Sequence, residues 1–164
     1  MTKGTVKGLT LEMMKEFREK QADTMKKLAP NITVTQLGEE DGAKIVHQHM
    51  KMPMFVTNRS VINVVHRKIN DDGSVTVLGT SLGTEDLQET HKDKIGSDVV
   101  AINHFNYTHA KEVDGGVEIT MAACLDLAGS VMDIVKQKVG SRQLRGPERM
   151  FHLMLTGEVM KGGE

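Results

Sequence analysis

The chain has 164 residues and a formal net charge of −1. That length suffices for one domain that buries its own core, so we expect a single domain over 1–164. A charge this close to zero gives no global field that would attract nucleic acid or an anionic membrane. No segment approaches the roughly 18 apolar residues of a membrane span, and the first residues lack the apolar centre of a signal peptide. We therefore expect a cytoplasmic protein without a nucleic-acid partner.

The single cysteine, Cys124, lies inside an apolar run and has no partner for an internal disulfide. We expect it to be a core residue of a protein in a reducing compartment. The 12 methionines have flexible side chains that fill irregular gaps in a core or line an adaptable apolar surface.

The first predicted element is an amphipathic helix that follows Thr10 and ends before Pro30. Thr10 is a suitable N-cap, and proline stops a helix. Five apolar residues recur at helical spacing on one face: Leu11, Met14, Phe17, Met25 and Leu28.

After this helix the apolar period changes to two, which predicts strands rich in Val, Ile and Thr. Five strands are expected, over residues 43–50, 60–69, 74–82, 98–110 and 116–127. The segments "NDDGS" (70–74) and "VDGG" (113–116) carry the Asp-Gly pairs of tight hairpins, so the strands that they join should be antiparallel. Residues 83–97 are too many for a hairpin and too polar for a strand, which predicts a surface loop.

Helical spacing returns near the end of the chain. One face carries Val131, Ile134, Val135 and Val139, and a second segment begins near Pro147, with Met150, Phe151, Met154 and Leu155 as its apolar stripe. The order of helix, antiparallel strands and long C-terminal helix is typical of an α+β fold in which a curved sheet wraps around the last helix. Such an arrangement either encloses a ligand cavity or packs tightly without one.

On the last predicted strand, Ile119, Met121, Ala123, Leu125 and Leu127 alternate toward the helix. Asp126 ends the strand, where its carboxylate can accept backbone or arginine donors and hold a turn at Gly129.

Three segments together resemble the START domain, the lipid-transfer module related to steroidogenic acute regulatory protein. They are "MPMFVTNRSVINVVHR" (52–67), "DGSVTVLGTS" (72–81) and "CLDLAG" (124–129). The matching positions, in the family's order, are Pro53, Arg59, Gly73, Asp126 and Gly129.

The resemblance covers roughly 45–155 and implies a helix-grip fold with a cavity for one lipid and a C-terminal helix as its lid. The chain is short for the family at its N-terminal side, so an edge of the sheet needs cover, which a second copy of the chain in a homodimer would supply. Sterol-binding members carry a cavity arginine at the place of Val65, so cholesterol is not favoured. The ligand is expected to be sterol-like, phospholipid-like or fatty-acid-like.

We predict that the protein binds this lipid without a cofactor, a metal or a catalytic residue. The predicted ligand-binding residues are Arg59, Val61, Asn63, Val65, Asn103, Phe105, Tyr107, Ile119, Met121, Ala123, Leu125, Val131, Ile134 and Val135. Asn103, Phe105 and Tyr107 are assigned to one strand face by their alternation, and the polar side chains are expected to contact the head group.

Two other functions stay open. A small helix-grip cyclase or hydrolase would recruit His49, Tyr107 and Arg59 for acid–base chemistry. A packed interaction module would bind no ligand. His47 and His49 should face the same side of their strand and, with His66 or His104, have the donors of a metal site, but no carboxylate or cysteine pattern completes one. Basic residues near the end, from Lys136 to Arg149, suit transient membrane contact by the C-terminal helix.

Overall fold

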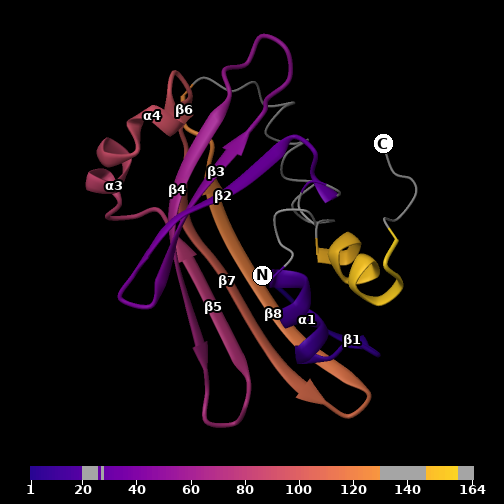
Figure 1. Cartoon of the computed structure of the whole chain (residues 1–164). Helices are drawn as coiled ribbons and strands as arrows, with labels where there is room; N and C mark the ends of the chain where they lie inside the picture. The colour runs from indigo at the N-terminus through magenta and orange to yellow at the C-terminus, as the bar shows by residue number, and fades with distance from the viewer. Residues whose placement is uncertain (20–25, 27, 130–146, 159–164) are drawn as a thin grey trace.

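The computed structural model describes residues 1–19, 26, 28–129 and 147–158 (Figure 1). Within these residues, eight strands form one sheet in the order β1-β8-β7-β5-β4-β3-β2, with β6 beside β4. The strands are β1 (Thr2–Lys7), β2 (Ile32–Glu40), β3 (Ala43–Met50), β4 (Arg59–Ile69), β5 (Val75–Thr80), β6 (Val99–Val100), β7 (Ile102–Val113) and β8 (Gly116–Asp126). The helices are α1 (Leu11–Glu19), α3 (Glu85–Thr90), α4 (Lys92–Ile95) and a helix over 147–156.

The five predicted strands are present, and the two predicted hairpins join antiparallel neighbours, β4 with β5 and β7 with β8. β1 and β2, which form the two edges of the sheet, were not predicted from the sequence. β1 is polar and short, and it is held by pairing with β8 rather than by an apolar face of its own. Gly116 permits this pairing, because a Cβ there would lie 2.3 Å from the carbonyl oxygen of Val6.

The two faces of the sheet are covered by different helices. We call the face against α1 and the 147–156 helix the inner face, and the face against α3 and α4 the outer face (Figure 1). On the inner face, Leu9 and Met14 pack with Ala110, Val117 and Ile119 near one end of the sheet. A second inner cluster joins Met50, Val61, Ala101 and Leu127.

Residues 83–97 form the cover of the outer face, which corrects the predicted surface loop. They contain α3 and α4, and their apolar side chains Leu87 and Ile95 pack against Ile45 and Ile62 of the sheet. The segment carries few apolar residues because only one side of each short helix touches the strands. Because most residues of the segment are polar, its sequence did not indicate two packed helices.

Both terminal helices place their apolar residues on the inner face. Thr10 is the N-cap that the sequence predicts, since its Oγ1 accepts a hydrogen bond from the Met13 amide at 3.1 Å. In the helix over 147–156, Phe151 and Met154 contact the cluster around Leu9 and Met14, which we call the α1 cluster. The stripe of this helix differs at one position: Leu153 is buried, whereas Leu155 is 41% exposed. No helix within the described residues is long and apolar enough to span a bilayer.

Candidate functional site

The inner face of β4 carries four of the predicted site residues, one at every second position. Arg59, Val61, Asn63 and Val65 point to this face because Val61 joins the inner cluster and side chains two apart share a face. Val61 and Asn63 are buried, and Val65 is half-buried. β4 therefore forms an apolar strip with one amide side chain at its centre.

Across the sheet, β8 supplies the second apolar strip. Ile119 is buried, Met121 and Leu125 are half-buried, and Ala123 is exposed on the same face. Leu125 packs against the second inner cluster, which contains Val61. Met121 packs against the α1 cluster. Three further predicted lining residues, Val131, Ile134 and Val135, lie outside the described residues.

A β-bulge in β7 corrects the predicted placement of Phe105 and Tyr107. Asn103 pairs with Leu125 of β8, but Phe105 pairs with Cys124, so His104 is an extra residue in β7. Directly paired residues of antiparallel strands place their side chains on the same face. Asn103 therefore faces inward with Leu125, whereas Phe105 and Tyr107 face outward. Strict alternation across the bulge gave the wrong face for both aromatic residues.

Asn63 and Asn103 form a buried polar pair on the inner face. The Asn103 side-chain amide donates to Asn63 Oδ1 at 2.7 Å and to the Gly79 carbonyl at 3.4 Å. The exposed fractions of Asn63 and Asn103 are 7% and 9%, so the pair lies in an environment of low polarity where hydrogen bonds are costly to leave unmade. The sequence predicted both residues for the site, and the structure brings them together.

Arg59 lies at the start of β4 and is 2% exposed. Its guanidinium donates to the carbonyl oxygens of Leu127 at 2.6 Å and Ala128 at 3.1 Å, and also to the carbonyl of Thr57. These partners are all backbone carbonyls. Arg59 thus ties the start of β4 to the end of β8, where the chain leaves the sheet.

The turn after β8 has the structure that the sequence predicts. Asp126 Oδ1 accepts a hydrogen bond from the Ala128 amide at 2.9 Å. Ala128 and Gly129 then adopt left-handed backbone conformations, with φ of 52° and 62°. Together with the Arg59 contacts, this turn anchors the end of β8 as far as Gly129.

Cys124 is exposed, which corrects its prediction as a core residue. It lies on the outer face of β8 beside Phe105, which is 40% exposed. The apolar run around Cys124 reflects the inner-facing residues of β8, whereas Cys124 itself takes the opposite side of the strand.

The histidines of β3 face the same side, as predicted, but that side is the outer face. His47 Nε2 lies 3.0 Å from the Ser60 hydroxyl, which donates to Asp98 at 2.7 Å. His49 Nε2 lies 3.3 Å from the same Asp98 carboxylate. Burial lowers the pKa of His47 and the neighbouring His49 lowers it further, while Asp98 raises it.

No group of three or more potential metal ligands forms among the described residues. His66 and His104, the proposed partners of His47 and His49, are both exposed on the sheet. The three residues considered for catalysis do not converge either, because Arg59 is bonded to carbonyls, His49 to Asp98, and Tyr107 faces outward from a distant strand.

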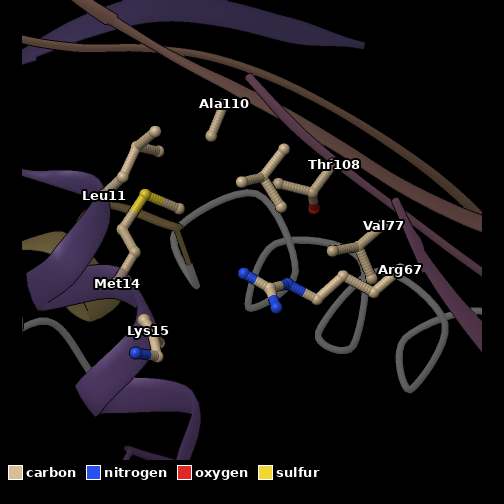
Figure 2. A pocket seen from close by; sticks show the side chains of 8 residues that line it. Leu11, Met14, Lys15, Arg67, Val77, Thr108 and Ala110 are labelled. Carbon is tan, nitrogen blue, oxygen red and sulfur yellow. The ribbon is translucent and has the colours of Figure 1, made fainter. Parts of the chain in front are cut away.

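A hollow opens on the inner face between α1 and strands β4, β5 and β7 (Figure 2). The hollow is small, because the space in it that the centre of a water molecule can occupy is about 10 Å³. The lining residues are Leu11, Met14, Lys15, Arg67, Val75, Val77, Thr108 and Ala110. None of the strand residues in this lining was predicted from the sequence as a site residue. The alternation that selected Val65 continues to Arg67 and was the available signal.

Solved structures that resemble this chain include START domains. Human StAR-related lipid transfer protein 5 has a TM-score of 0.69 at 14% identity, over 93% of this chain and 73% of that one. Human STARD10 has a TM-score of 0.71 at 18% identity, over 93% of this chain and 61% of that one. The StAR-related lipid transfer protein from Xanthomonas axonopodis has a TM-score of 0.63 at 15% identity, over 93% and 82%.

The chain therefore has the helix-grip fold of the START domains, which confirms the predicted resemblance at the level of the fold. It spans less than two thirds of the STARD10 structure. No protein-family model and no curated protein matches the sequence.

Proposed function

We propose that the protein binds one lipid or other hydrophobic molecule on the inner face of the sheet and carries it between membranes or presents it to a partner. The observation that carries this proposal is the inner face itself. Apolar strips of β4 and β8 flank the buried Asn63–Asn103 pair, within a fold that is shared with domains described as lipid-transfer proteins. An apolar surface with a few convergent polar groups is the usual composition of a ligand site.

Burial of the ligand's apolar surface would supply most of the affinity. At about 25 cal/mol per Å², removing about 400 Å² of hydrocarbon from water contributes roughly 10 kcal/mol before the costs of ordering the ligand. The Asn63–Asn103 pair is the polar group next to this apolar surface, and its amides can hydrogen-bond a polar group of the ligand. The proposed lining residues are Val61, Asn63, Val65, Asn103, Ile119, Met121, Ala123 and Leu125, with Val131, Ile134 and Val135 from the segment beyond Gly129.

Exchange of the ligand requires the inner face to open. The turn at Ala128 and Gly129, held by Arg59 and Asp126, is the proposed hinge for the C-terminal segment. Basic residues between Lys136 and Arg149 would hold that segment on an anionic membrane during exchange. The proposal includes a cytoplasmic location. It also includes a second copy of the chain at β1 or β2, because both strands are edges of the sheet.

The binding is non-covalent in this proposal, and the chemistry is not enzymatic. The side chains that a helix-grip enzyme would use, Arg59, His49 and Tyr107, are directed to three separate places. A general acid and base must reach the same substrate atoms, and these groups do not share a cavity.

Native mass spectrometry of the freshly purified protein tests the proposal, followed by solvent extraction and identification of anything bound. The expected result is a stoichiometric adduct whose mass matches a lipid, or its appearance after incubation with mixed liposomes. A clean protein mass under both conditions would contradict the proposed function.

A further inference from the structure

We infer that the hollow between α1 and the sheet binds the anionic head of a lipid, a carboxylate or a phosphate, while the inner face takes its hydrocarbon chain. This inference rests on the proposed function and names the ligand class. The floor of the hollow is apolar, formed by Leu11 and Met14 of α1 and by Val75, Val77 and Ala110 of the strands. Its polar lining consists of Lys15, Arg67 and Thr108.

Arg67 projects from the sheet into this hollow. Figure 2 shows its guanidinium extended from the strand toward Met14 of α1, across the space that Val77 and Thr108 border. Arg67 pairs with Val77 in the register of β4 and β5, and Val77 pairs with Thr108 of β7. The three residues therefore form one row across the inner face, with the cation at its β4 end.

The charges around the hollow favour an anion. Within the described residues, no carboxylate lies within ion-pair distance of Arg67. Lys15 contacts Glu12 at 3.5 Å, but both side chains are more than half exposed, so this pair is weak and screened by salt. The carboxylate of Glu112 accepts the Leu11 amide at 3.2 Å and is thereby engaged at the start of α1.

The chemistry of these groups selects a carboxylate or a phosphate on an apolar chain. A guanidinium binds either anion through two parallel hydrogen bonds, and a lysine ammonium adds a second charge. The Thr108 hydroxyl is a further donor. Arg67 and Asn63 are four residues apart on one face of β4, or roughly 13 Å along the strand, with Val65 between them. A hydrocarbon chain that starts at Arg67 would therefore run over Val65 toward the buried Asn63–Asn103 pair.

The test compares three probes with the same hydrocarbon chain by native mass spectrometry and calorimetric titration. They are oleate, oleoyl lysophosphatidate and the neutral oleyl alcohol. The variants are Arg67→Met and Lys15→Met, and the matched control is Lys68→Met. Lys68 is the next residue of β4 and is exposed on the other face, so its substitution removes the same charge without touching the hollow. All three positions are exposed, so the thermal unfolding of the variants should match the parent.

We expect the parent to bind at least one of the anionic probes about tenfold or more tightly than the alcohol. Arg67→Met should lose about tenfold in affinity for that anion and little for the alcohol, Lys15→Met should lose less, and Lys68→Met should match the parent. The preferred anion then identifies the head group as a carboxylate or a phosphate. Equal binding of anions and alcohol, or equal affinities of Arg67→Met and Lys68→Met, would overturn the inference while leaving the proposed function intact. Failure of the parent to bind any probe would count against both.

Discussion

Replacement of Arg59 should destabilise the protein, because this buried side chain joins the start of β4 to the end of β8. Arg59→Met preserves most of the side-chain volume but removes the donors to the carbonyls of Leu127, Ala128 and Thr57. At about 1 kcal/mol net for each lost hydrogen bond, the free energy of unfolding should fall by about 3 kcal/mol. For a chain of this length, each kcal/mol lowers the melting temperature by roughly 2–4 °C, so a decrease of about 6–12 °C is expected.

Thermal and urea unfolding followed by far-ultraviolet circular dichroism measures this loss, since the chain has no tryptophan for fluorescence. Arg67→Met is the matched control because it removes an exposed arginine from the same strand, and it should change the stability by less than about 0.5 kcal/mol. Arg59→Lys keeps the charge but not the forked donors, so it should fall between the two. If Arg59→Met and Arg67→Met have the same melting temperature, the carbonyl contacts of Arg59 do not hold the end of β8.

Three further changes test other parts of the structure. Gly116→Ala should lower the free energy of unfolding by about 2–3 kcal/mol, because its Cβ would lie 2.3 Å from the Val6 carbonyl oxygen. The β1 amides should then be less protected from hydrogen exchange. Gly4→Ala has open space around it and should be neutral. Gly129→Ala should cost about 1 kcal/mol in urea unfolding through its φ of 62° alone, and an unchanged midpoint would refute that strain. Burial lowers the pKa of His47 in the folded protein, so the unfolded chain takes up a proton on this histidine at a higher pH than the folded protein does. The free energy of unfolding should therefore decline below about pH 6.5. His47→Gln should flatten that decline.

The sequence predicted the strands whose apolar residues alternate, because one face of each is buried. It could not predict β1, whose place depends on the absence of a side chain at Gly116, a partner more than a hundred residues away. β2 does alternate at its start, from Ile32 to Thr35, but the alternation ends there and the register shifts between Gln36 and Gly38. Such features arise from pairing rather than from local pattern.

The candidate site shows the same limit. Alternation placed Val61, Asn63 and the β8 residues on the correct face, but it failed beyond His104, where one extra residue in β7 reverses the side to which Phe105 and Tyr107 point. Arg59 was recognised as important from its position, yet its carbonyl partners come from the far end of β8. The same alternation also places Arg67 on the inner face. Arg67 lines a hollow only because α1 packs across the sheet, and alternation within a strand does not reveal that packing.

The central claim is that a hydrophobic ligand lies on the inner face of the sheet. Because the chain lacks tryptophan, Ala123→Trp and Cys124→Trp each introduce one fluorophore at neighbouring exposed positions on opposite faces of β8. Titration with a lipid brominated in its acyl chain should quench the tryptophan at position 123 and leave the one at position 124 bright. Equal quenching of both variants, or no quenching at position 123, would contradict the account.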